Sequence, residues 1–123
     1  MQFKPEMIVA IQEGRKTQTR RPMRAEDGVV LEGKKIVGVN RKGRALWRVG
    51  CGYSICPGRG KNRVGFLKIT AIREEPLLTI SEKDARREGF TGAETFLAAW
   101  RSLYPKFGGA WNHVWVLSFE KVG

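Results

Sequence analysis

The sequence predicts an α+β fold in which a small, partly closed β-barrel carries peripheral helices. Two segments, residues 64–73 and 113–121, alternate apolar with polar side chains, as half-buried strands do. Residues 93–104 instead repeat their apolar side chains at helical spacing. The length of 123 residues suits one hydrophobic core, and short segments punctuated by glycine connect these elements. An antiparallel barrel with helices at its periphery accounts for all three observations.

The N-terminal segment is expected to run from strand to helix to strand. A short strand over residues 2–4 precedes a helix over residues 5–13, because proline suits the first helical position. Gly14 provides the stop of this helix. Residues 17–21 alternate in character and are expected to be extended, and Pro22 limits their continuation.

The middle of the chain is rich in glycine and in short strand patterns. Residues 24–44 are charged and weakly patterned, which indicates either a hairpin-like excursion or a mobile loop. Residues 47–49 and 53–56 are typical of short strands. Residues 57–61, Pro-Gly-Arg-Gly-Lys, predict a turn whose two cations suit a backbone phosphate or simply lie in solvent.

The rest of the chain predicts a strand, two helices and a closing strand. Residues 64–73 are expected to form a central strand. Ser81 begins a helix in the manner of a capping box, and Gly89 ends it. Thr91 begins a second helix with the Thr-x-x-Glu signature, and the aromatic stripe of this helix is expected to pack on the core rather than stack on a base. Residues 113–121 complete the sheet.

Composition indicates the class of protein. We expect one domain over residues 1–123, a cytoplasmic location and no membrane partner, because no window approaches the roughly 20 apolar residues that cross a bilayer. The cysteines, Cys51 and Cys56, and the single histidine, His113, lack the spacing of a zinc site. The sequence therefore predicts no metal site and no cofactor.

Charge is distributed unevenly along the chain. Residues 1–73 hold 17 Lys or Arg and 5 Asp or Glu, whereas residues 74–123 hold 6 and 7. Such asymmetry is typical of contact with nucleic acid, because neutralised phosphates release counterions. A well-solvated basic surface is the alternative interpretation.

Residues 14–22 read Gly-Arg-Lys-Thr-Gln-Thr-Arg-Arg-Pro and hold four cations and two hydroxyl groups. This composition predicts an anion-binding segment, since backbone amides near a glycine and adjacent cations can hold a phosphate. The same residues allow a second use, in which Lys16 removes the proton of a threonine. The first use requires only charge, and the second requires geometry.

The spacing of Gly14, Lys16 and Arg21 resembles the Gly-x-Lys-x-x-x-x-Arg pattern of the ASCH domain family. The resemblance extends to the preceding helix, the helix that begins at Ser81 and the closing segment 115–119, and so covers most of the chain. It implies a barrel of the PUA-like superfamily of RNA-binding folds.

The motif resembles most closely that of bacterial amidohydrolases of this family, which remove the acyl group from the exocyclic amine of acetylated cytidine. The resemblance implies Lys16, Thr19 and Glu88 as catalytic residues, Glu88 because residues 82–88 match the Glu-Lys-x-Ala-x-x-Glu arrangement. A hydroxyl becomes a good nucleophile when a neighbour accepts its proton, and a lysine can do so once burial or nearby cations lower its pKa. Arg15, Arg20 and Arg21 are candidates for that effect.

Positions 16 and 19 of a regular strand face opposite sides, so Lys16 and Thr19 meet only if Lys16 precedes the strand or the chain turns between them. Gly14 favours such an irregular start. Otherwise Lys16 and Arg21 hold a phosphate, Thr19 packs in the sheet, and Glu88 is an exposed carboxylate at a helix end.

The basic segment 24–44 is longer than its counterpart in the compact amidohydrolases, and a free nucleoside has no phosphates for the cations of residues 57–61. Other ASCH members are described as RNA-binding or RNA-cleaving. The alternative function is therefore an RNA-binding module or a ribonuclease, and the partner is a cytidine-type nucleoside or RNA. The residues predicted to bind substrate or phosphate are Gly14, Arg15, Arg20, Arg21, Arg59 and Lys61.

Overall fold

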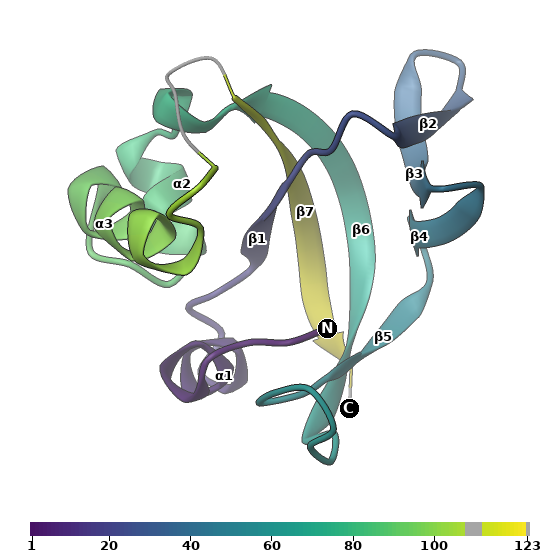
Figure 1. Cartoon of the computed structure of the whole chain (residues 1–123). Coiled ribbons are helices and arrows are strands. Elements are labelled where there is room, and N and C mark those ends of the chain that lie inside the picture. Colours follow the sequence, from purple (N-terminus) through teal and green to yellow (C-terminus); the bar gives the residue numbers. More distant parts are fainter. Residues whose placement is uncertain (108–111, 123) are drawn as a thin grey trace.

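The computed structural model describes residues 1–107 and 112–122 and contains two antiparallel sheets with helices around them (Figure 1). The strands of the larger sheet lie in the order β1-β7-β6-β5. They are β1 (Gln18–Pro22), β5 (Gly52–Ile55), β6 (Gly65–Pro76) and β7 (His113–Val122). The smaller sheet has the order β2-β3-β4 and consists of β2 (Asp27–Glu32), β3 (Lys35–Arg41) and β4 (Arg44–Arg48).

The helices lie at the periphery of the sheets, as expected. They are α1 (Pro5–Gln12), the 3₁₀ turn η1 (Leu77–Thr79), α2 (Glu82–Arg87) and α3 (Ala93–Leu103). In Figure 1, α2 and α3 lie beyond β1, on the side away from the smaller sheet. None of the helices in the described part of the chain has the length and apolar character required to span a membrane.

Strand β7 is buried on both of its faces and separates two hydrophobic clusters. Trp115, Leu117 and Phe119 belong to the cluster that fills the space between the two sheets and α1. Val114 and Val116 belong to the second cluster, which includes the buried residues of α2 and α3. The three larger side chains are buried, as the alternating pattern of a half-buried strand requires.

The described residues form two separately hydrogen-bonded sheets and no closed barrel, which supports the predicted partial closure only loosely. The predicted mixture of antiparallel sheets and helices is confirmed. Residues 24–44, for which two alternatives were open, contain all of β2 and β3, which pair antiparallel, so the hairpin-like excursion is the correct one. The strand predicted over residues 2–4 was wrong, because Gln2 forms only an isolated parallel bridge with Cys56.

The start of α3 also differs from the prediction. Its N-cap is Gly92 rather than Thr91, because the Thr91 hydroxyl lies 3.1 Å from the Thr95 hydroxyl and does not cap a backbone amide. Thr95 Oγ1 instead accepts a hydrogen bond from Gly92 N at 3.2 Å, and Glu82 of α2 accepts one from Ala93 N. A side chain distant in sequence thus completes this helix end.

Candidate functional site

Lys16 lies in the irregular connection between α1 and β1. Gly14 has a φ of +80°, which reverses the chain after α1, and the amides of Arg15 and Lys16 both donate to Ala10 O. Thr17 N then donates to Arg87 O at 2.7 Å, which ties this segment to the end of α2. Since Lys16 precedes β1, strand parity does not separate it from Thr19, and both residues line one pocket.

This pocket has a volume of about 370 Å³ and lies between the N-terminal segment, β1, the end of α2 and α3. Its volume falls in the range of small-molecule sites. Most of its wall is apolar, with side chains from α1, from α3 and from the segments on either side of α3. The apolar lining residues include Phe3, Met7, Phe90, Phe96, Trp100 and Tyr104.

Lys16 and Glu88 form a buried ion pair in the pocket wall, and each side chain is only 3% exposed. Lys16 Nζ donates to Glu88 O at 2.8 Å and to Glu88 Oε1 at 3.1 Å. Burial is the largest cause that places the pKa of Lys16 below its ordinary value of 10.5; Glu88 opposes this effect, whereas Arg21 and Arg20 add to it. The amine can therefore lose its proton more easily than a lysine in solution.

Thr19 lies on β1 opposite Leu117 of β7 and is 5% exposed. Within the described residues its hydroxyl group forms no hydrogen bond, either with Lys16 or with another side chain. Two N–H positions of Lys16 are taken by Glu88, and the third position is where a neutral amine carries its lone pair. Lysine and threonine thus each retain a position for proton exchange at the same pocket.

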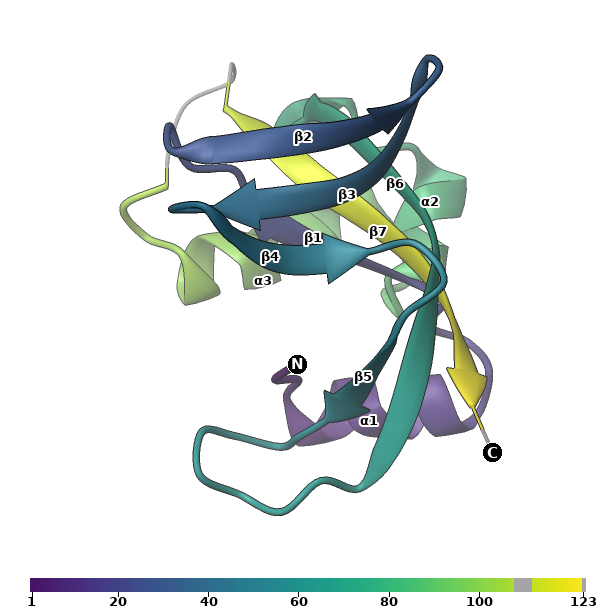
Figure 2. The ribbon, with the colours of Figure 1, turned by 90° about the vertical axis from the view of Figure 1, so that its right-hand side faces the viewer.

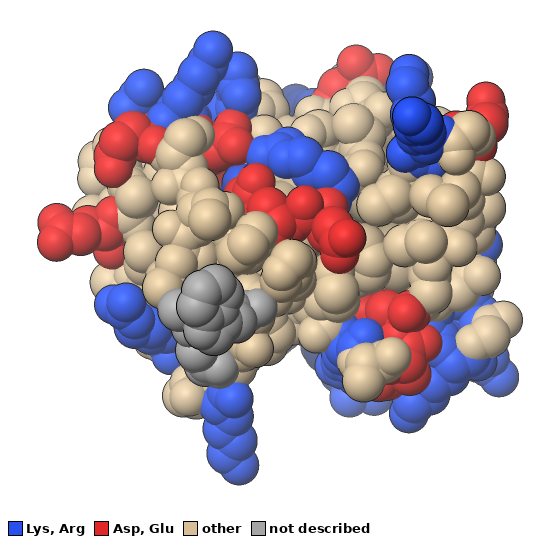
Figure 3. Space-filling model, turned by 90° about the horizontal axis from the view of Figure 1, so that it is seen from above, with Lys and Arg blue, Asp and Glu red and all other residues tan. Residues whose placement is uncertain are grey.

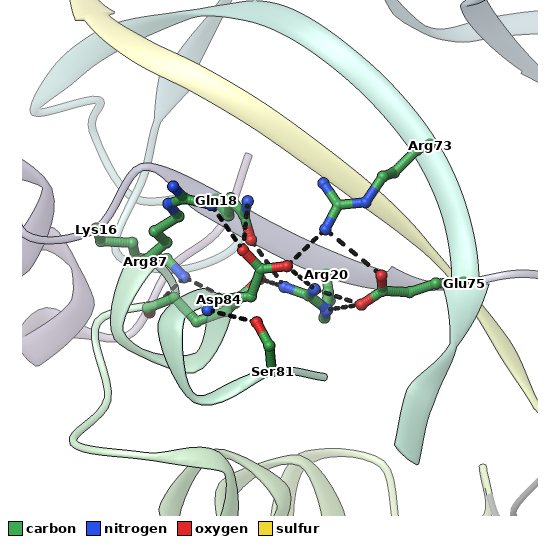
Figure 4. A network of polar contacts seen from close by, with 9 residues as sticks. Lys16, Gln18, Arg20, Arg73, Glu75, Ser81, Asp84 and Arg87 are labelled. Atoms are coloured by element: carbon green, nitrogen blue, oxygen red, sulfur yellow. Dashed lines mark hydrogen bonds and ion pairs between the residues drawn. The ribbon is translucent and has the colours of Figure 1, made fainter. Parts of the chain in front are cut away.

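Arg20 is the centre of a polar network that joins β1, β6 and α2 (Figure 4). Its Nη1 donates to Glu88 Oε2 at 2.9 Å and to Gln18 Oε1 at 3.0 Å. Its Nε donates to Glu75 at 3.2 Å, and Nη2 binds both Glu75 and Asp84. The guanidinium is 0% exposed, and its contacts match the five N–H donors that an arginine possesses.

Arg21 faces the pocket next to the N-terminal segment. Its Nη2 donates to Gln2 O at 2.9 Å, and its guanidinium carbon lies 5.0 Å from the centre of the Phe3 ring. Burial lowers the pKa of Arg21. Within the described residues, Arg21 Nε and Trp100 Nε1 are buried nitrogen atoms without a hydrogen-bond partner, and both residues line the pocket.

No protein-family model matches the sequence, and no curated protein does. Solved structures match it over nearly its whole length. The ASCH domain from Lactobacillus crispatus superposes with a TM-score of 0.71 at 15% identity, covering 94% of this chain and 69% of that one. The chain has the fold of an ASCH domain.

Two other solved structures share this fold. Protein EF3133 from Enterococcus faecalis matches with a TM-score of 0.61 at 20% identity, over 93% of this chain and 68% of that chain. The ASCH protein from Zymomonas mobilis matches with a TM-score of 0.56 at 18% identity, over 98% and 67%. The fold implied by the spacing of Gly14, Lys16 and Arg21 is thereby confirmed.

On this ASCH fold, five of the predicted site residues line the pocket: Lys16, Thr19, Arg20, Arg21 and Glu88. Gly14, Arg15, Arg59 and Lys61 do not line it. Arg15 points away and pairs with Glu13 at 2.7 Å, with both side chains about half exposed. Glu88 is 2% exposed, so the interpretation of it as an exposed helix-end carboxylate was wrong.

Two predicted roles change with the structure. Arg20 was expected to bind substrate or phosphate, but its donors are already bound to protein acceptors, and none remains for a ligand. The aromatic residues of α3 were expected to pack on the core rather than stack on a base. Phe96 and Trp100 belong to the second hydrophobic cluster, and both also form part of the pocket wall.

Sequence reasoning did not identify three further members of the Arg20 network: Gln18, Glu75 and Asp84. Gln18 alternates with Arg20 along β1, which was the one available signal. The carboxylates lie more than 50 residues away from Arg20 along the chain, and nothing in their local sequence connects them to it. Their meeting depends on the pairing of β1 and β6 with β7, which lies between them, and on how α2 packs beside this sheet.

Proposed function

We propose that this ASCH protein is an amidohydrolase that removes an acyl group from the exocyclic amine of a cytosine-type base. The observation that carries the proposal is the buried Lys16–Glu88 pair in the wall of a nucleobase-sized pocket that Thr19 also lines. Buried ionisable groups with a perturbed pKa at a pocket are candidates for catalysis.

The reaction follows from the chemistry of these groups. Thr19 Oγ1 attacks the acyl carbonyl carbon while neutral Lys16 accepts the hydroxyl proton. The tetrahedral intermediate collapses, the C–N bond breaks, and the lysine returns that proton to the leaving amine. Water then hydrolyses the acyl-threonine ester, so that one water is consumed and one carboxylic acid and one amine are released. Glu88 holds the Lys16 amine in place throughout.

The lining of the pocket suits a planar base. Its aromatic side chains, Phe3, Phe96, Trp100 and Tyr104 among them, offer stacking surfaces. The unpartnered nitrogen atoms of Arg21 and Trp100 lie in the same walls. A cytosine ring presents acceptors at its carbonyl oxygen and ring nitrogen, and a buried donor without an acceptor costs about 1–3 kcal/mol, so such a ligand fits the wall chemically.

The test is incubation of the purified protein with N4-acetylcytidine, with release of cytidine followed by chromatography. Wild-type protein is expected to release cytidine. Glu88→Gln should still bind acetylcytidine but lose turnover, since it keeps the shape and removes the charge that holds Lys16. Arg15→Ala is the matched control, because Arg15 belongs to the same motif but lies outside the pocket lining. Absence of turnover by the wild type between pH 7 and 10 would refute the proposal for this substrate.

A second candidate function, RNA binding, is favoured by a separate observation. Residues 33–73 contain 11 Lys or Arg and no Asp or Glu. Among the described residues, three of these cations pair with carboxylates: Arg41, Lys68 and Arg73. The loop between β5 and β6 carries Arg59, Lys61 and Arg63, and its second residue, Pro57, lines the pocket. Figure 2 shows this loop on the same side of the molecule as α3 and the N-terminal segment.

Affinity for single-stranded RNA at increasing salt concentration tests this second candidate. Binding that neutralises several phosphates weakens steeply with salt, and Arg59→Ser with Lys61→Ser should reduce the slope by about 2. The matched control is Lys83→Ser with Arg101→Ser, which removes the same charges from α2 and α3, where basic and acidic side chains are interspersed (Figure 3). Equal slopes for both double variants would contradict a role of the loop.

A further inference from the structure

The Arg20 guanidinium binds the carboxylate that holds the candidate base, and its N–H donors are all taken up by protein acceptors. Arg20 Nη1 lies 2.9 Å from Glu88 Oε2, whereas Lys16 Nζ lies 3.1 Å from Glu88 Oε1. One carboxylate thus serves two cations, one oxygen for each. The arginine side chain is 0% exposed, so its role must act through Glu88 rather than by contact with a ligand.

The network around Arg20 is balanced in charge without Lys16. Its arginines, Arg20, Arg73 and Arg87, face an equal number of carboxylates, those of Glu75, Asp84 and Glu88. A proton on Lys16 therefore adds one uncompensated positive charge next to the buried centre of this network, Arg20 and Glu88. Because an isolated buried charge is costly, the lysine proton is the charge that this cluster releases most easily.

We propose that Arg20 is a positioning residue: by binding Glu88, it allows the Lys16 amine to become neutral and to accept the proton of Thr19. The inference rests on the proposed function for its kinetic consequence. Its consequence for the protonation of Lys16 is independent of any reaction.

The ionisable groups around Lys16 come from several elements. Glu88 follows α2, while Arg20 and Arg21 lie on β1. The other ionisable groups that line the same pocket are those of Lys4, Glu6 and Tyr104. Among the ionisable groups of the described residues, only Glu88 hydrogen-bonds the Lys16 amine, and Arg20 binds the other oxygen of this same carboxylate.

Titration of the Lys16 Nζ by NMR, in protein labelled with ¹⁵N-lysine and assigned with Lys16→Met, measures the effect directly. Arg20→Gln leaves Glu88 to Lys16 alone, so Lys16 should keep its proton to a pH higher by on the order of one unit or more. Asp84→Asn and Glu75→Gln remove a negative charge from the same cluster, and Lys16 should lose its proton at a lower pH than in wild type. The proposal requires the titration midpoint of Lys16 to shift in opposite directions in the basic and the acidic variants, because simple loosening of the fold would shift it in the same direction in all three.

Two further variants complete the experiment. Arg73→Gln removes the same charge as Arg20→Gln, but Arg73 is 43% exposed and its ion pairs among the described residues are with Glu75 and Asp84, so its shift should be much smaller. Arg20→Lys retains the cation and should restore a midpoint near that of wild type. If Arg20→Gln does not fold, the acidic variants decide: a shift to lower pH supports the proposal, and an unchanged midpoint overturns it. An Arg20→Gln protein that titrates as wild type also overturns it.

The pH dependence of turnover forms the second arm. Turnover should rise with pH as Lys16 loses its proton, and the rise should move to higher pH in Arg20→Gln and to lower pH in Asp84→Asn. If the NMR midpoints shift as expected while acetylcytidine is not hydrolysed, the proposed function fails and the role of Arg20 stands. If turnover is present but neither the midpoints nor the profile moves, the role of Arg20 fails and the proposed function stands.

Discussion

Two carboxylates of this molecule, Asp27 and Glu88, have side chains that are almost completely buried, but their partners differ in kind. Asp27, at the start of β2, accepts hydrogen bonds from Arg41 Nε at 2.7 Å and Arg41 Nη2 at 2.9 Å. It also accepts from Arg24 N at 2.9 Å and from Trp115 Nε1 at 2.8 Å. Glu88 instead shares its oxygens between an arginine and a lysine whose own charge is disfavoured by burial.

The comparison shows how the same ion-pair chemistry serves two purposes. The donors around Asp27 outweigh its burial and lower the pKa of this carboxyl from 3.8 to about 2, so Asp27 is ionised at neutral pH. Asp27 joins the two sheets and lies outside the pocket lining. At Glu88 the lysine proton is held weakly, and the pair opens onto a pocket. A carboxylate that stays ionised stabilises the fold, whereas a lysine that loses its proton more easily is available for proton transfer.

The largest effect is expected on the activity at the Lys16–Glu88 site. Lys16→Ala, Thr19→Ala and the double variant should each lose acetylcytidine hydrolysis by a similar factor of at least about 100, because residues that act as one unit are strongly non-additive. Comparison of kcat/KM for the single and double variants measures this. Losses that multiply in the double variant, or near-normal turnover by Thr19→Ala, would return these residues to a phosphate-holding role.

The next largest effect is expected on the stability of the protein when Asp27 is changed. Asp27→Asn should lower the free energy of unfolding by roughly 2 kcal/mol at pH 7, since the native pKa of Asp27 lies below its unfolded value. This contribution is present above pH 3.8 and is lost as the pH falls toward 2, so wild type and variant should converge in acid. Urea unfolding at several pH values tests this, and turnover per folded molecule should remain unchanged. A constant difference down to pH 2 would show that the charge of Asp27 is not the cause.

A smaller change in stability is expected for Lys16→Met. Removal of the lysine also removes the cost of burying its charge, and Arg20 still compensates the charge of Glu88. The free energy of unfolding should therefore fall by less than about 1 kcal/mol at pH 7. Between the native pKa of Lys16 and 10.5, the unfolded wild type binds more protons than the native one, so Lys16 makes wild-type stability rise with pH in this window. The variant should lack that rise. A loss as large as that of Asp27→Asn would remove the contrast between the two sites.

The smallest effect is expected at an exposed ion pair, which serves as a baseline for both sites. Lys68 of β6 lies opposite Glu120 of β7 at 3.1 Å, with 45% and 59% of the side chains exposed. Water and salt screen such a pair, so Lys68→Ala should change the free energy of unfolding by less than about 0.5 kcal/mol. Thermal denaturation at several salt concentrations measures this. A loss of more than about 1 kcal/mol in the free energy of unfolding would mean that the exposure of an ion pair does not determine its contribution to stability.

The sequence predicted much of the fold because strand alternation and helix caps are local signals. The central strand, the closing strand and the helix that begins after Ser81 are present where expected. The errors occurred where distant residues decide the outcome. Glu82 completes the start of α3 from another helix, and the sheet of β2, β3 and β4 is recognisable only once its three strands pair.

The same distinction applies to the candidate site. Lys16 and Thr19 are near each other in sequence, and Gly14 indicated an irregular connection, so their placement at one pocket was predictable. The role of Arg20 was not, because a cation in a basic segment has the same sequence signature whether it faces solvent or buried carboxylates. Only the packing of α2 and the pairing of both β1 and β6 with β7 decide between the two.

The position of β1 at the edge of the larger sheet has a consequence for the order in which the protein assembles. The only strand that β1 pairs with in the described chain is β7, with Gln18 opposite Ser118 and Pro22 opposite Val114. During synthesis, the segment that holds Lys16 and Thr19 is therefore made early and stays without its template until residues 114–118 leave the ribosome. Contacts of such long sequence separation form slowly. The pocket is thus completed near the end of folding, and truncation before β7 removes the site as well as a strand.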